Sequence, residues 1–172
     1  MSFAPIVMFV YNRADHFNKT FEALSKCPEA KESDLFIFSD GPKNEEGAQK
    51  VNEVRDELKK IQNAHSFKSI TVIESPENKG LAKSVINGVS DVIEKYGRVI
   101  VVEDDCMPSE HFLKYMNNAL EFYSENKHIG SIAGYIPQIE FPVDYKSDVF
   151  AAYRSCSWSW ATWADRWQNV DW

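Results

Sequence analysis

The stretch that decides the fold reads Arg98-Val-Ile-Val-Val-Glu-Asp-Asp-Cys-Met-Pro108, four β-branched residues running directly into three acids. An uninterrupted, valine-rich apolar run of this length is typical of a strand buried on both faces in a parallel sheet. Glu103, Asp104 and Asp105 would then lie at the carboxyl end of that strand, the edge at which open α/β sheets bind ligands. Clustered carboxylates repel one another unless a cation or hydrogen-bond donors neutralise them. The stretch therefore predicts a site for a metal-bound phosphate.

Apolar strands and amphipathic helices alternate along the rest of the chain. Continuous apolar runs predict further strands over 6–11, 35–38 and 69–74. Helical spacing of apolar residues predicts helices over about 17–24, 51–61 and 81–96, the last one stopped by Gly97. Another helix is expected after Pro108, with Ser109 as its N-cap. The fold class is therefore α/β: a three-layer α/β/α domain with a mostly parallel, Rossmann-like sheet.

The C-terminal part of the chain is less regular. A short strand is expected over 129–133, and the pattern over 149–153 is compatible with one more. Five tryptophans crowd the last fifteen positions, and helical spacing would put Trp160, Trp163 and Trp167 on one helical face. These rings fit core packing as well as they fit a surface on which a sugar could stack.

Length, charge and cysteine content exclude several classes of protein. The 172 residues suffice for one domain. A net charge of −7 argues against nucleic-acid binding through a broad basic face. Three cysteines without C-x-x-C spacing argue against a disulfide framework or a zinc cluster. The first apolar run is too short to cross a bilayer and follows no basic segment, so we expect a cytoplasmic protein without a transmembrane segment.

Polar residues at other predicted strand ends lie on the same edge as the acids. Arg13 follows the first strand and could approach a ribose or phosphate, and Asp40 follows the second and could accept a hydrogen bond from a nucleobase. Lys79 and Lys83 are the nearest charges for a pyrophosphate. Each of these residues alone also fits an ordinary surface position, and the three acids alone would fit a solvated turn. Because all of these residues are expected at one edge of the sheet, a binding site is favoured over these alternatives.

Other nucleotide and hydrolase motifs are missing from the sequence. It contains no G-x-S-x-G, no Walker A and no G-x-G-x-x-G pattern. None of the four histidines pairs with a cysteine or a second histidine at metal-ligand spacing. A nucleotidyltransferase would need a glycine-rich basic loop after the first strand, and Asn12-Arg-Ala-Asp-His16 is not one.

Four segments together resemble a glycosyltransferase of the GT-A fold. They are Pro5-Ile-Val-Met-Phe-Val-Tyr-Asn-Arg13, Phe38-Ser-Asp-Gly41, Val101-Val-Glu-Asp-Asp105 and Ser157-Trp-Ser-Trp-Ala-Thr-Trp163. The pattern is similar to that of N-acetylglucosaminyltransferase I-like enzymes and of related bacterial family-two-like transferases. Its most specific part is the acid triplet, which resembles the D-x-D motif of such enzymes.

The resemblance implies a role for each residue of the edge. Asp105 would coordinate a divalent metal, Mn²⁺ or Mg²⁺, that bridges the diphosphate of the donor. Asp104 would contact the ribose and Glu103 a hydroxyl of the donor sugar. The segment from Ser157 resembles a G-W-containing loop that lines the sugar site, with Ser159 in place of the usual glycine. Asp40 matches the acid that binds a uracil-type base in such enzymes, and Arg13 matches an arginine near the nucleotide. Lys83 matches, more loosely, a basic residue on the helix expected over 81–96.

The resemblance also implies a reaction, which is the transfer of a sugar from a nucleotide-diphosphate donor, preferably a UDP-sugar, to an acceptor hydroxyl, with inversion. The acceptor would be a glycan or a lipid-linked molecule in polysaccharide synthesis, which leaves peripheral association with the inner membrane open. We expect residues 1–172 to form one nucleotide-sugar-binding domain, the N-terminal part of a longer enzyme, with the catalytic base beyond Trp172. The alternative is a non-catalytic module that binds a nucleotide sugar.

Overall fold

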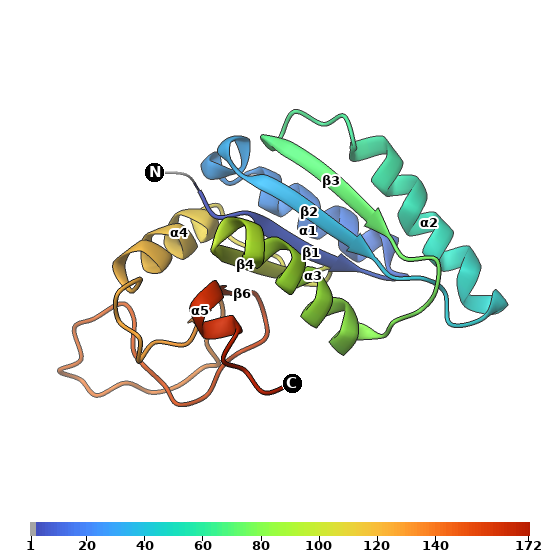
Figure 1. Cartoon of the computed structure of the whole chain (residues 1–172). Coiled ribbons are helices and arrows are strands. Elements are labelled where there is room, and N and C mark those ends of the chain that lie inside the picture. The colour runs from blue at the N-terminus through green and yellow to red at the C-terminus, as the bar shows by residue number, and fades with distance from the viewer. Residues whose placement is uncertain (1–2) are drawn as a thin grey trace.

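The computed structural model describes residues 3–172 as a six-stranded sheet with helices on both faces (Figure 1). Across the sheet the strands follow the order β3-β2-β1-β4-β6-β5. β1 to β4 pair in parallel, and β6 runs antiparallel to both of its neighbours. The strands are Ile6–Val10 (β1), Asp34–Ser39 (β2), Ser69–Glu74 (β3), Arg98–Glu103 (β4), Ile132–Ala133 (β5) and Trp160–Trp163 (β6). The predicted three-layer, mostly parallel α/β fold is confirmed.

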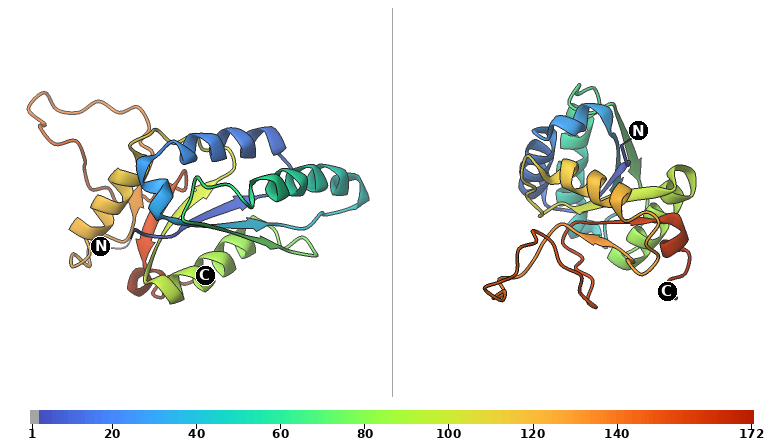
Figure 2. Two further views of the ribbon diagram at one scale, coloured as in Figure 1. Left: turned by 90° about the horizontal axis from the view of Figure 1, so that it is seen from above. Right: turned by 90° about the vertical axis from the view of Figure 1, so that its left-hand side faces the viewer.

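Helices cover the sheet on two sides, and Figure 2 shows α1 and α3 on opposite faces. One buried cluster joins the sheet to α1, α2 and α4, and the other joins it to α3 and α5. None of the helices in residues 3–172 is both long and apolar enough to cross a membrane. The helices are Ala14–Ser25 (α1), Pro28–Glu32 (η1, a 3₁₀ turn), Glu45–Ile61 (α2), Leu81–Tyr96 (α3), Phe112–Phe122 (α4) and Ala164–Trp167 (α5).

The central strands are apolar throughout because both of their faces are covered. In β1, Ile6 and Met8 enter the cluster on the α1 side, whereas Val7 and Phe9 enter the cluster on the α3 side. β4 divides in the same way, and its four residues from Val99 to Val102 are all buried. This is the arrangement expected for strands in the middle of a parallel sheet. Glu103, at the carboxyl end of β4, follows these four buried residues and is only partly buried.

Local signals explain where several helices begin and end. Gly97 stops α3 with a φ of +76°, in the left-handed region that glycine adopts without strain. Asn44 caps α2, since its side chain accepts a hydrogen bond of 2.8 Å from the Gly47 N–H. The prediction that Ser109 caps the next helix is wrong. That helix starts at Phe112, and the Ser109 carbonyl accepts the Phe112 N–H in the turn before it.

The C-terminal part departs from two further expectations. Residues 149–153 form no strand. Trp160 and Trp163 belong to a strand rather than to a helix, so their rings lie on opposite faces of the sheet. Trp163 packs on the α4 side, and Trp160 stacks on Trp167 on the α3 side with ring centroids 5.6 Å apart. Helical spacing was misleading here because β6 is defined by pairing with β4, more than fifty residues earlier in the chain.

Candidate donor-binding site

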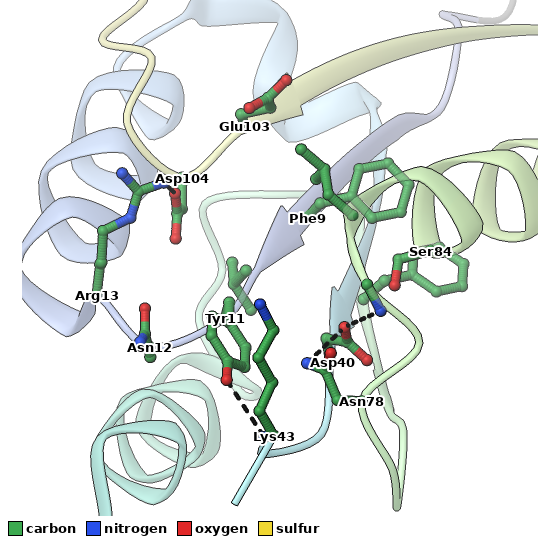
Figure 3. A pocket seen from close by; sticks show the side chains of 14 residues that line it. Phe9, Tyr11, Asn12, Arg13, Asp40, Lys43, Asn78, Ser84, Glu103 and Asp104 are labelled. Atoms are coloured by element: carbon green, nitrogen blue, oxygen red, sulfur yellow. Dashed lines mark hydrogen bonds and ion pairs between the residues drawn. The ribbon is translucent and has the colours of Figure 1, made fainter. Parts of the chain in front are cut away.

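A cleft of about 410 Å³ lies at the carboxyl ends of β1, β2 and β4. Glu103 and Asp104 line one side of it, whereas Asp40 and Asn78 line the other, with Tyr11 and Lys43 close by (Figure 3). The parallel register of β1 with β2 and β4 brings these residues together from distant parts of the sequence. The cleft thus occupies the position at which open α/β sheets bind ligands.

The acid side of the cleft is held by one arginine. Arg13, directly before α1, donates one hydrogen bond of 2.5 Å to Asp104 and another of 3.0 Å to Asp105. Burial lowers the pKa of Arg13, but its two carboxylate partners outweigh this, so the pKa lies above the ordinary value. The Arg13 side chain is 45% exposed. A cation on the protein itself, the Arg13 guanidinium, therefore already neutralises part of the acid cluster.

Asp104 is the most buried acid of the cluster, with an exposed fraction of 3%. Its main-chain carbonyl accepts a hydrogen bond of 2.8 Å from the buried hydroxyl of Thr20 on α1, and its carboxylate accepts one from the Tyr11 N–H. Burial raises the pKa of Asp104 above its ordinary value, although Arg13 opposes this shift. The turn that carries the acids is thus fixed to α1 and to the end of β1.

Glu103 also titrates abnormally. Burial, followed by the negative charges of Asp105 and Asp104, raises the pKa of Glu103 above its ordinary value. Its carboxylate lines the cleft, and within residues 3–172 Arg13 forms its ion pairs with Asp104 and Asp105 rather than with Glu103. Unpaired carboxylates with raised pKa values in a cleft are candidates for ligand binding.

The acid side fits a divalent cation only if the ligand supplies most of the coordination. Among the described residues, no group of three or more histidine, cysteine or acidic side chains is arranged to hold a metal. Asp105 is the accessible acid, with a side chain that is 40% exposed. Mg²⁺ and Mn²⁺ commonly bind through one or two carboxylates together with the phosphates of a substrate. The residues present match that kind of site rather than a cage built by the protein alone.

The opposite side of the cleft is organised around Asp40. Its Oδ1 accepts the N–H groups of Gly41 and Lys79, both at 2.9 Å. Its Oδ2 accepts the Gly80 N–H at 3.0 Å and the Asn78 side-chain amide at 3.1 Å. Asp40 therefore ties the end of β2 to the loop before α3.

The structure brings most of the predicted residues together, but not all of them. Arg13, Asp40, Glu103 and Asp104 line the cleft, and Asp105 joins them through Arg13. Lys83 is exposed on α3 and does not line it. Lys79 contributes its main-chain N–H to Asp40 rather than a charge to the cleft. Other residues that line the cleft, none of them among the predicted site residues, include Tyr11, Asn12, Lys43, Asn78, Leu81 and Ser84.

Residues 134–159 form a long irregular loop whose two ends lie side by side. The loop is closed at its base by a hydrogen bond of 2.7 Å from the Gly134 N–H to the Ser159 carbonyl. Ser159 has a φ of +56°, a left-handed backbone conformation that favours glycine. This explains in physical terms why a glycine was expected at position 159. Between its ends the loop exposes many large apolar side chains, among them Phe141, Val143 and Tyr153.

Residues 6–147 match the family described as Glycosyl transferase family 2. The matched range contains the four parallel strands, Arg13, Asp40, Lys83 and the three acids, but not the segment from Ser157 to Trp163. No curated protein sequence matches the chain significantly.

Solved structures with a similar fold include S. aureus TarS and the mannosyltransferase PcManGT from Pyrobaculum calidifontis in complex with GDP-Man and Mn²⁺. The comparison with TarS gives a TM-score of 0.53 at 17% identity over 73% of this chain and 20% of that chain. The structure of TarS residues 1–349 gives 0.55 at 17% identity over 77% and 34%. PcManGT gives 0.53 at 12% identity over 76% and 34%. The chain thus spans 20–34% of the length of these structures, and the likeness establishes the GT-A type of fold.

Proposed function

Because the chain belongs to glycosyltransferase family 2, we propose that it binds a nucleotide-diphosphate sugar and transfers the sugar to an acceptor hydroxyl. One observation carries the proposal. The acid cluster, which Arg13 partly neutralises, faces Asp40 and the loop before α3 across a single cleft at the carboxyl edge of the sheet. Such a cleft can hold the charged diphosphate at one side and the base at the other. A UDP-sugar is the donor that we favour.

The acid side would bind the diphosphate, the ribose and the sugar. We assign Asp105 to a divalent metal, Asp104 to the ribose and Glu103 to a hydroxyl of the donor sugar. Arg13 would exchange its ion pairs with Asp104 and Asp105 for the phosphates of the donor, which carry more negative charge. A bound Mn²⁺ or Mg²⁺ would offset the charge that develops on the leaving diphosphate. PcManGT, with GDP-Man and Mn²⁺ bound, supports both the donor class and the use of a metal.

The subtype of the enzyme, the stereochemistry of transfer, the class of acceptor and the role of Lys83 can also be proposed. The acid triplet at Glu103 supports the likeness to N-acetylglucosaminyltransferase I-like enzymes and an inverting displacement. The exposed apolar and aromatic side chains of the 134–159 loop support a glycan or lipid-linked acceptor. Lys83 lies outside the cleft, so we propose at most a long-range electrostatic effect on the donor for this residue. No described residue is assigned as the catalytic base.

Calorimetric titration with UDP, with and without Mn²⁺, tests the proposal. We expect Mn²⁺ to raise the affinity for UDP on the order of tenfold or more, which corresponds to about 1.4 kcal/mol. The variant Asp105→Ala should lose this increase. Asp91→Ala, which removes an exposed acid from α3, is the matched control and should keep it. Metal-independent UDP binding, or an unchanged effect of Mn²⁺ in Asp105→Ala, would contradict the assignment of a metal to Asp105.

A further inference from the structure

We propose that Arg13 keeps a divalent cation away from Asp104 and Asp105 until a nucleotide diphosphate is bound, so that binding of the cation depends on the nucleotide. The inference rests on the proposed function, because it concerns the same cation and the same donor. It goes beyond that function by stating an order of binding and the residue that sets this order.

In the free protein, the Arg13 guanidinium occupies the place that a cation would take (Figure 3). Its Nη2 lies 2.5 Å from Asp104 Oδ1, and its Nη1 lies 3.0 Å from Asp105 Oδ2. A cation bound to either of these oxygens would stand next to the positive charge of the guanidinium, and like charges in close contact repel each other. A cation and Arg13 therefore compete for the same two carboxylates.

The rest of the acid cluster offers little to a cation that arrives alone. Asp104 is only 3% exposed, and its carboxylate also accepts the Tyr11 N–H. The second oxygen of Asp105 faces the Cys106 thiol at 3.9 Å, a weak hydrogen bond, and is part of a carboxylate that Arg13 already holds. Mg²⁺ and Mn²⁺ bind tightly at one or two carboxylates only when phosphates add further oxygens. Without a nucleotide, the cation should therefore bind weakly.

The burial of Asp104 prevents Arg13 from leaving the cluster without a replacement. A buried carboxylate that loses its positive partner keeps an uncompensated charge, which is strongly unfavourable. Arg13 forms the ion pair with this carboxylate. The guanidinium should therefore leave Asp104 and Asp105 only when another cation takes its place there and an anion receives it elsewhere.

A nucleotide diphosphate provides that anion. The Arg13 side chain is 45% exposed and lines the cleft, so it can turn towards phosphates bound there while α1 stays in place. A planar guanidinium binds phosphate as well as carboxylate. The nucleotide thus removes Arg13 from the two carboxylates, and the cation compensates the charge that Arg13 leaves behind. Each ligand favours the movement that the other needs, and such coupling is reciprocal.

Mn²⁺ binding in the absence of nucleotide, followed by electron paramagnetic resonance of the free ion, tests the inference. We expect Arg13→Met to bind Mn²⁺ on the order of tenfold or more tightly than the wild type, because the two carboxylates lose a charged hydrogen-bond partner. In a spectrum of backbone amides, Mn²⁺ should broaden Asp105 in the wild type only when UDP is present. In Arg13→Met it should broaden Asp105 without UDP.

Two further variants separate occupation of the carboxylates from a general effect of charge. Lys43→Met removes a cation from the same cleft that, within residues 3–172, forms no ion pair with the acids. Its affinity for Mn²⁺ should rise by less than about fivefold. Arg13→Lys keeps the charge but cannot bridge both carboxylates, so its affinity should be intermediate. Thermal unfolding adds a second readout, since Mn²⁺ alone should raise the unfolding temperature of Arg13→Met more than that of the wild type.

The outcomes distinguish this inference from the proposed function. If Arg13→Met binds Mn²⁺ no more tightly than the wild type, or no more tightly than Lys43→Met, the inference is overturned, and metal-dependent binding of UDP would leave the proposed function standing. If UDP fails to bind in the presence of Mn²⁺ although Arg13→Met gains affinity for Mn²⁺, the proposed function fails, and only the competition between Arg13 and a cation remains.

Discussion

At the scale of single residues, Arg13 determines the charge state of the site. One guanidinium reaches two carboxylates because its N–H groups point in fixed, separate directions, and Asp104 and Asp105 stand side by side at the end of β4. Asp104 is almost fully buried and would carry an unpaired charge without this partner. Arg13 therefore stabilises the free protein, and the same contact is the one that a nucleotide and its cation would replace.

Replacing Arg13 by methionine should destabilise the protein by about 1–2 kcal/mol at pH 7, since Asp104 would lose a charged hydrogen bond at a partly exposed partner. Burial already raises the pKa of Asp104, and the loss of Arg13 would raise it further. Because the folded-state pKa of Asp104 lies above the ordinary value both with and without Arg13, the destabilisation should be full above these raised pKa values and should shrink as the pH falls through them towards the ordinary aspartate pKa.

Urea unfolding of Arg13→Met at pH 7 and at pH 3.5–4, a range that spans the ordinary aspartate pKa of about 3.9, measures this effect. Arg13→Lys is the matched control, since it keeps the charge but cannot bridge both carboxylates with one planar group, and its loss should be smaller. Equal stability of wild type and Arg13→Met at pH 7 would show that the ion pairs contribute nothing to the fold.

At the scale of elements, the site depends on where loops are fastened. α1 contributes both Arg13 at its start and Thr20 within it, so the helix after β1 holds the turn after β4 at two points. On the other side, Asp40 fastens the end of β2 to the loop that precedes α3. The loop before α3 and the turn that carries Asp104 and Asp105 are thus held by different hydrogen bonds, independently of each other.

Replacing Gly41 by alanine should separate the loops after β2 and β3, because the new Cβ would collide with the main chain of Glu77 at 2.4 Å. We expect a destabilisation of about 1–3 kcal/mol, as for other overpacked sites, together with weaker UDP binding. Gly130→Ala is the control: its Cβ would meet no atom within 4 Å, and its stability should change by less than about 0.5 kcal/mol. Thermal unfolding and UDP titration measure both effects, and wild-type behaviour of Gly41→Ala would contradict this account of the cleft.

The elements that could be predicted are those whose signal is local. Apolar runs predicted β1 to β4, and Gly97 predicted the end of α3, because burial of β1 and β4 on both faces and a left-handed C-cap leave direct marks in the sequence. β6 could not be predicted, since it consists of four residues that are stabilised by pairing with distant β4. The same limit explains the wrong strand at 149–153, whose apolar residues are exposed in a loop.

At the scale of the whole molecule, the parallel sheet gathers the site at one edge. Strand ends alone predicted Arg13, Asp40 and the three acids as neighbours, because parallel strands end together. Sequence position could not show that Lys83 lies outside the cleft or that Asn78 lies inside it, since both depend on the path of the loop before α3. It also could not show that the Asp40 carboxylate is fully hydrogen-bonded within the protein.

The central claim is that the carboxyl edge of this sheet binds a nucleotide diphosphate together with a cation. Paramagnetic line broadening by Mn²⁺ in the presence of UDP locates that cation directly in a spectrum of backbone amides. We predict selective broadening at Asp104, Asp105 and Arg13, and none at Asp34 or Lys68, whose ion pair lies at the opposite edge of the sheet. Broadening centred on Asp34 and Lys68, or no UDP-dependent broadening at the acid cluster, would contradict the account.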